Sequence, residues 1–372
     1  MIQSSYYKDE EISHVYYDLS TINNSQVPQS LVFQEIRSSS FLDTPNDYNV
    51  SVLRFNIDSA SLPLMIPQVL SDGINTDCNK LVYSVSLMYE NTTVQTYLNF
   101  IPQNMNFTVP AGIVQQSNAE SEYYYLYSSQ HFIDIVNNAL YKCMTDLVAT
   151  CPDLTPSKYA PFFEMNPSTN VPTLNADILG FDNNTEKSIK IFLNTPLHTL
   201  FSSMPAYYYG YSQPLGKNVQ IKIFSQDNSN IYTINSINYI QSYAEFSVCG
   251  LWQPIQSIVI TTSMPIISNF VSPAKVITDA NLNNFGSNNL TINQLVDFQV
   301  PTEIGNEYKS GGNISYQSVK YRLVELKGNT PLSNVQLAFF WKSKFGILHQ
   351  FLLEAGCCAN IKLLFRLKSF NS

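Results

Sequence analysis

Apolar runs of strand length recur along most of this chain, with turn-forming residues between them. Residues 219–224 and 361–368 also alternate apolar and polar side chains, which is the period of a strand with one buried face. The predicted strands are 31–36, 49–57, 81–89, 94–101, 123–127, 173–178, 188–193, 219–224, 231–240, 244–248, 255–262, 274–277, 295–300, 319–326, 335–341, 348–353 and 360–367. No helical pattern alternates with these strands, so a parallel α/β sheet is excluded.

The composition agrees with an all-β protein. Charged residues make up 13 % of the chain, about half of the roughly 25 % usual for soluble domains. A helical bundle would cover its surface with Glu, Lys and Arg, whereas the polar residues here are mainly Asn, Ser, Thr and Gln, which favour turns and strand faces. Hydrophobic residues reach 44 %, which is enough for a packed interior and excludes disorder for most of the chain.

One segment breaks the strand pattern and predicts an amphipathic helix near 130–148. Ser128 or Ser129 can cap its start, and Pro152 ends it. Its apolar side chains recur at helical spacing: Phe132, Ile135, Val136, Ala139, Leu140, Cys143, Met144 and Leu147. It is the one long helix that the sequence predicts.

The strands are numerous enough for two sandwiches of about eight strands each. We therefore expect an N-terminal arm over 1–30, a first jelly-roll over 31–205 that contains the helix, and a second jelly-roll over 206–372. Residues 14–19 could add a strand to the arm. A tyrosine cluster at 207–211 lies near the expected boundary and predicts packing between units. A single jelly-roll with a large β insertion domain is the alternative fold.

The charge distribution argues against nucleic-acid binding. The net charge is −8, the isoelectric point is near 5.0, and no run of Lys and Arg occurs that could displace phosphate counterions. Lys362, Arg366 and Lys368 alternate with apolar residues and predict the solvent side of an edge strand. The first residues do not form a signal peptide and no run reaches ~18 apolar residues, so secretion and membrane spanning are not expected.

The sequence contains no recognisable catalytic or metal-binding motif. Its four histidines lie far from one another, from cysteine and from paired acids, and no nucleophile elbow, phosphate-binding loop or zinc-protease motif occurs. Six cysteines form no CxxC pair, which predicts reduced thiols. Two distant carboxylates could still meet in a glycosidase-like site. We predict no catalytic, cofactor-binding or metal-binding residue, no cofactor, and no enzyme activity.

Several stretches together resemble capsid proteins of small eukaryotic DNA viruses, in the polinton, adintovirus, virophage and polinton-like group. The resemblance is loose in each motif and covers most of the chain. It is carried by residues 35–37 (Glu-Ile-Arg), 45–48 (Pro-Asn-Asp-Tyr), 50–55, 62–63 (Leu-Pro), 252–265 (from Trp252 to Pro265), 321–326, 335–341, 344–346 (Lys-Phe-Gly) and 356–365.

The resemblance implies a structural capsid protein of an icosahedral DNA virus, assembled with copies of itself and with other capsid proteins. A double jelly-roll chain would form a trimeric capsomer, and a smaller jelly-roll protein would form a pentamer at the vertices. We expect the trimer, with the pentamer as the alternative. The expected location is the virion, after synthesis in the host cytoplasm or nucleus. A β-rich attachment protein that binds a receptor or glycan, or an enzyme built on a β-sandwich, would be the remaining functions.

Overall fold

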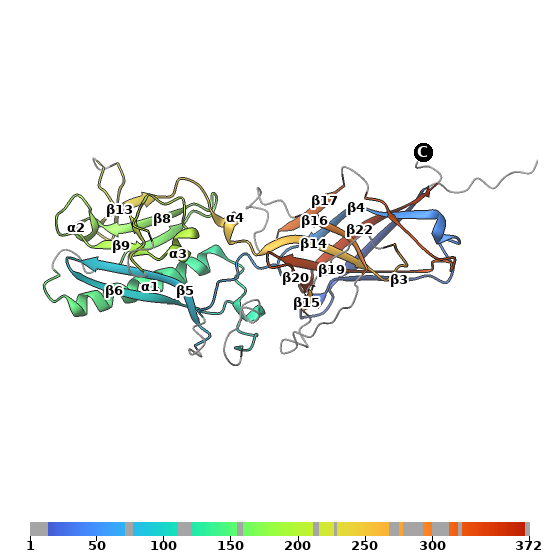
Figure 1. The fold of residues 1–372 in the computed structure, drawn as a ribbon, viewed down its shortest axis with the longest axis horizontal. Helices are drawn as coiled ribbons and strands as arrows, with labels where there is room; N and C mark the ends of the chain where they lie inside the picture. The colour runs from blue at the N-terminus through green and yellow to red at the C-terminus, as the bar shows by residue number, and fades with distance from the viewer. Residues whose placement is uncertain are drawn as a thin grey trace, which may run out of the picture. The chain divides into compact units, whose positions relative to one another are not determined.

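The computed structural model shows a chain that is mostly β-sheet, which confirms the all-β class (Figure 1). The structure describes residues 14–70, 77–110, 121–154, 159–210, 216–226, 229–267, 275–277, 293–299, 312–318 and 322–368. The chain divides into two compact units, which we call unit 1 (1–62 and 255–372) and unit 2 (63–254). Unit 2 is therefore an insertion between two segments that together build unit 1.

Unit 1 contains a first antiparallel sheet with the strand order β1-β22-β4-β17. In Figure 1 its blue and red strands lie side by side, because the two ends of the chain supply them. Its strands are β1 (His14–Ile22), β22 (Cys358–Leu367), β4 (Tyr48–Asp58), β17 (Asn313–Gln317) and β18 (Val324–Glu325), which pairs with β4. The central pair joins β4 to β22 from Tyr48↔Leu367 to Ile57↔Ala359.

The second sheet of unit 1 has the order β15-β20-β19-β14-β16, and β3 pairs with β19 beside β20. Its strands are β15 (Lys275–Ile277), β20 (Ile347–Gln350), β19 (Asn334–Ser343), β14 (Ile255–Thr262), β16 (Gln294–Gln299) and β3 (Val32–Ile36). The short strands β2 (Gln29–Ser30) and β21 (Leu352–Leu353) pair separately, and a 3₁₀ turn η1 (Pro45–Asp47) precedes β4. Only β15 and β20 are parallel among these pairs of described strands.

Aromatic side chains join the two sheets of unit 1 face to face. Phe55 on β4 lies 5.1 Å from Phe298 on β16 and 5.7 Å from Phe339 on β19, measured between ring centroids. All three rings are buried. Because β4 belongs to the first sheet and the other two strands to the second, these contacts define the core of a β-sandwich.

Unit 2 contains a five-stranded sheet and a four-stranded sheet. The first has the order β10-β11-β9-β5-β6: β10 (Ala206–Tyr208), β11 (Val219–Ile221), β9 (Lys190–Leu193), β5 (Lys80–Tyr89) and β6 (Thr92–Asn99). The second has the order β12-β13-β8-β7: β12 (Ile231–Ile234), β13 (Ile237–Tyr243), β8 (Pro172–Asp177) and β7 (Phe162–Met165). Short helical turns connect them: η3 (Glu122–Tyr124), α2 (Ile178–Phe181), α3 (Thr195–Thr199) and α4 (Cys249–Trp252).

The predicted amphipathic helix is confirmed as α1 (Ser129–Thr150). Its predicted apolar stripe is buried, together with Ile133, and packs against β5, β6 and β7. Phe132 on this stripe makes an edge contact with Trp252 of α4 at 5.2 Å between ring centroids. Cys151 closes the last turn by donating its N–H to the Leu147 carbonyl, one residue before Pro152.

The predicted division of the chain at 205/206 requires correction. This boundary runs through unit 2, where Val219 on β11 pairs with Leu193 on β9. In the structure the two units do not follow one another along the chain, because unit 2 lies between the two segments of unit 1. The reason is physical: hydrogen bonding between strands joins segments that are far apart in sequence, and no composition change marks that choice.

The predicted N-terminal arm also requires correction. Residues 14–22 form β1, which pairs with β22 over nine positions and buries Tyr17 and Leu19. Asn23 continues this pairing by donating its N–H to the Cys357 carbonyl. Residues 14–22 are therefore part of the sandwich, and residues 1–13 lie outside the described part of the chain. The same pairing makes β22 an interior strand, not the predicted edge strand.

Several local strand predictions are wrong, among them 348–353, which is split into β20 and β21 with different partners. Residues 122–124 form the turn η3, and 244–248 contain no strand. The predicted strand 231–240 is the hairpin β12–β13, in which Ile234 pairs with Ile237 around Asn235 and Ser236. Both turn residues have positive φ, 49° and 66°, which is the geometry of a type I′ turn and allows a two-residue loop.

Candidate assembly surfaces

The histidines lie in four separate places, as the sequence analysis predicted from their spacing. His131 is in the first turn of α1, where Nε2 lies 2.7 Å from the Ile101 carbonyl. His198 lies in α3, where burial lowers its pKa and so favours the neutral ring. His349 on β20 stacks on Trp341 at 4.0 Å between ring centroids, and His14 begins β1. Each position suits packing or local hydrogen bonding.

The cysteines are free thiols. Burial raises the pKa of Cys143 to about 11, and it also raises the pKa of Cys249. Both groups stay protonated at neutral pH and are poor nucleophiles. Burial also raises the pKa of Cys357, and the nearby Asp58 carboxylate adds to this effect. Among the described residues, no three His, Cys, Asp or Glu side chains are grouped to hold a metal ion, and no helix there is long and apolar enough to cross a membrane.

Edge strand β1 offers one surface of unit 1 for contact with another chain. It ends the sheet order, so one of its two backbone edges faces away from β22. Tyr16 and Ile22 are exposed on the outer face of the strand. Between them Asp18 forms an ion pair of 3.1 Å with Lys362, whose ammonium also lies 5.4 Å from the Tyr16 ring centre. An edge without a paired strand in the described part of the chain, with exposed apolar side chains, is typical of a strand that pairs or packs with a neighbour.

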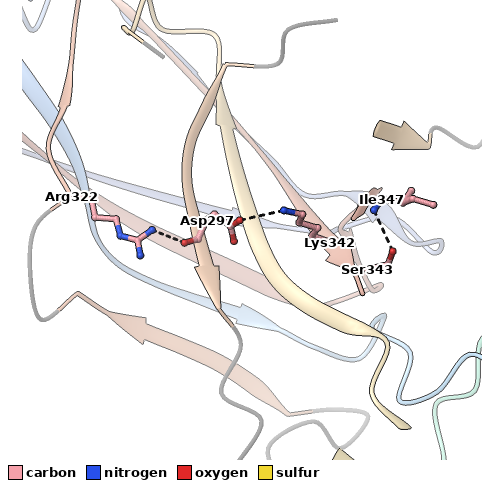
Figure 2. Close-up of polar contacts among 5 residues, drawn as sticks. All are labelled: Asp297, Arg322, Lys342, Ser343 and Ile347. Carbon is pink, nitrogen blue, oxygen red and sulfur yellow. Dashed lines mark hydrogen bonds and ion pairs between the residues drawn. The ribbon is translucent and has the colours of Figure 1, made fainter. Parts of the chain in front are cut away.

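The outer face of the second sheet carries a small polar network (Figure 2). Asp297 on β16 and Lys342 on β19 approach across β14, with 3.9 Å between Oδ2 and Nζ. Arg322 donates from its guanidinium to the backbone carbonyl of Asp297 at 2.8 Å. These groups are partly exposed, so the ion pair contributes little to stability, and the network mainly orients side chains at the surface.

The hairpin between β19 and β20 ends in an exposed aromatic ring, Phe345, with 60 % of its surface accessible. The Ser343 hydroxyl accepts hydrogen bonds from the N–H groups of Phe345 and Ile347, both at 3.3 Å (Figure 2 shows the second). Gly346 has a φ of 80°, which the turn requires. The hairpin predicted at residues 344–346 is confirmed, and it holds an apolar group in solvent on an ordered turn.

Unit 2 carries the predicted tyrosine cluster on β10, which ends its sheet, and on the residue that follows it; Tyr211 lies outside the described residues. Tyr207, Tyr208 and Tyr209 are all exposed. The Lys222 ammonium lies 4.3 Å from the Tyr207 ring centre, and the Tyr209 hydroxyl donates to Oε1 of Gln220 at 2.9 Å. These contacts hold the rings within unit 2. Exposed tyrosines on an ordered strand are typical of interaction surfaces.

A groove of about 680 Å³ lies between β6 and α1 in unit 2. One wall is the strand segment 95–99, and the other wall is a flank of α1 that includes Ile135, Ala139 and Lys142. Sequence patterns predicted both elements but not the groove, because its walls are some forty residues apart and contain no recognisable motif. Surfaces of this kind, which combine strand edges, exposed aromatic rings and a groove, are suited to binding other protein chains.

Comparisons with known proteins agree with this assessment. The family model described as Sputnik minor capsid protein V18/19 matches residues 15–367. A Sputnik virophage protein described as uncharacterized protein V18 is 32 % identical over 147 residues, which covers 38 % of this chain and 87 % of that protein.

Two solved structures have a similar fold. A chain in the 3.5 Å cryo-EM structure of the Sputnik virophage matches with a TM-score of 0.78 and 25 % identity, over 97 % of this chain and all of that one. The mavirus penton protein matches with a TM-score of 0.61 and 16 % identity, over 95 % of this chain and 99 % of that one. The chain therefore belongs to the Sputnik minor capsid protein V18/19 family: it is a structural, non-enzymatic protein of the virion capsid, where it assembles with other capsid proteins.

Proposed function

We propose that five copies of this chain form the vertex unit of an icosahedral DNA-virus capsid, with unit 1 as a single jelly-roll and unit 2 as its inserted domain. The observation that carries the proposal is the division of the chain. Unit 1 takes strands from both ends, and unit 2 occupies 63–254 without interruption. A double jelly-roll capsomer would have two sandwiches that follow one another along the chain, whereas here unit 2 lies between the two segments of unit 1, which favours the vertex role.

The comparisons support the same choice. The matching family is described as a minor capsid protein, and the mavirus protein with a similar fold is described as a penton protein. The fold similarity to the mavirus protein extends over both units, since it covers 95 % of the chain. For this chain, the vertex role and the pentamer are both part of the proposal.

We also propose that the protein is made in the host cytoplasm or nucleus. All six cysteines are free thiols, and the two nearest in sequence, Cys357 and Cys358, are only partly covered or exposed. Thiols in such positions persist in a reducing compartment.

The test is the mass of the purified full-length chain in solution, measured by native mass spectrometry and followed by negative-stain imaging. A species with five times the monomer mass of 42.1 kDa and a five-fold outline supports the proposal. A trimer with a hexagonal outline would overturn it in favour of the capsomer role. A chain that stays monomeric over a hundred-fold range of concentration would also overturn it.

A further inference from the structure

The groove between β6 and α1 follows an open strand edge. β6 is the last strand of its sheet and pairs with β5 on one side. Five consecutive residues of β6, 95–99, line the groove. Successive side chains of a strand point to opposite faces, so a groove reached by all five must run along the backbone edge itself. Within the described part of the chain no strand pairs with the other side of β6, so its backbone N–H and C=O groups there are available to a further strand.

Helix α1 forms the second wall and runs antiparallel to β6. Near the start of the helix, His131 Nε2 lies 2.7 Å from the Ile101 carbonyl. Nearly four turns later the Cys143 thiol donates to the Val94 carbonyl at 3.2 Å. The groove is thus bounded by a strand edge and a helix flank over its whole length, which is the arrangement that binds an extended peptide by strand addition.

The lining of the groove is apolar in the middle and charged at both ends. Leu98, Ile135 and Ala139 line its middle and are at most 5 % exposed. Lys80 lies at the end nearer the start of α1, with its ammonium 5.0 Å from the Tyr97 ring centre. The far end carries Lys142 and Asp146. This pattern fits an extended segment with apolar or aromatic side chains and with charges of both signs.

We propose that the groove binds the N-terminal segment of a second copy, residues 1–13, as an added strand beside β6. The inference rests on the proposed function, because it needs several copies in one assembly. Two terminal segments lie outside the described part of the chain, 1–13 and 369–372. Four residues cannot span a strand edge of five, whereas thirteen extend to about 43 Å at roughly 3.3 Å per residue.

The sequence of this segment matches the groove. Tyr6 and Tyr7 are strand-forming residues that favour an added strand beside β6. Lys8 is followed by the three acids Asp9, Glu10 and Glu11, which provide partners for both signs of charge at the ends of the groove.

The experiment is site-specific photo-cross-linking of the full-length chain. p-Benzoylphenylalanine replaces Tyr97 in the groove, and in a matched control it replaces Tyr141, which is exposed on α1 and does not line the groove. Equal amounts of ¹⁴N- and ¹⁵N-labelled protein are denatured together and refolded as a mixture, so that assemblies contain both labels, and are then irradiated and mapped by mass spectrometry. We expect position 97 to cross-link to residues 1–13 in mixed-isotope pairs, and position 141 to give none of this product.

Each other outcome overturns the inference. Cross-links from position 97 to residues 1–13 within one isotope only would place the segment on its own chain. Cross-links to another segment, or equal yields at both positions, would show that the groove does not select residues 1–13. The mass of the same samples distinguishes the two proposals. If five-copy assemblies form without the cross-link, only this inference is wrong. If no assemblies form, the proposed function is wrong.

Discussion

Replacing Phe55 with alanine should destabilise unit 1 more than any surface change. Its ring is 2 % exposed and lies 5.1 to 5.7 Å from the rings of Phe298, Tyr316 and Phe339. Truncation of a buried phenylalanine costs about 3–5 kcal/mol, from lost transfer energy and the remaining cavity. With a urea m-value of about 2–3 kcal/mol/M, the unfolding midpoint should fall by roughly 1–2.5 M.

The chain offers a specific reporter for this measurement. It has two tryptophans, Trp341 in unit 1 and Trp252 in unit 2. In a Trp252→Phe background the fluorescence of Trp341 reports the unfolding of unit 1 alone, so the two units need not unfold together. Phe345→Ala is the matched control, because this ring is exposed and its removal should change the free energy of unfolding by less than about 0.5 kcal/mol.

The result that would refute the reasoning is an equal midpoint shift for Phe55→Ala and Phe345→Ala. The ring of Phe55 would then contribute no more than an exposed ring, and the two sheets of unit 1 would not be packed through it. A conservative Phe55→Leu variant should lie between the wild type and the alanine variant, because it keeps part of the buried volume.

Three further predictions concern pH, thiol reactivity and the N-terminus. Burial raises the pKa of Glu354, so the folded protein favours the protonated carboxyl group. The stability that this preference provides is lost as pH rises through the raised pKa. Glu354→Gln should therefore raise the urea midpoint at neutral pH and leave it unchanged below the ordinary carboxyl pKa. Native alkylation with iodoacetamide, read by mass spectrometry, should label the exposed Cys358 and spare Cys143, and equal labelling would contradict the raised pKa of the buried thiol. Deleting residues 1–25 should lower the thermal midpoint because it removes β1, whereas deleting 1–13 should leave the midpoint unchanged and weaken assembly.

Local pattern predicted many individual elements closely. The strand predicted at 255–262 is β14, and the helix predicted near 130–148 is α1. Both depend on side-chain periodicity, which a run of eight or more residues records in its own sequence. The hairpin β12–β13 was predicted as one strand because Asn235 and Ser236 interrupt the apolar run by only two residues.

The partners of each strand could not be predicted in this way. β4 pairs with β22, from Tyr48↔Leu367 to Ile57↔Ala359, across almost the whole length of the chain. Backbone hydrogen bonds are the same for every residue type, so a strand carries little information about which other strand it joins. The wrong boundary at 205/206, the misassigned arm and the misassigned edge strand all follow from this limit.

The sequence by itself determined the secondary structure class, the absence of catalytic motifs and the resemblance to capsid proteins, because periodicity, composition and short motifs are local properties. Only the tertiary structure decided that both ends of the chain build unit 1, that unit 2 is an insertion, and that a groove opens between β6 and α1. These features depend on which distant segments pack together. Which segments pack together depends on the total burial and hydrogen bonding of the whole chain, so it cannot be predicted from any single segment.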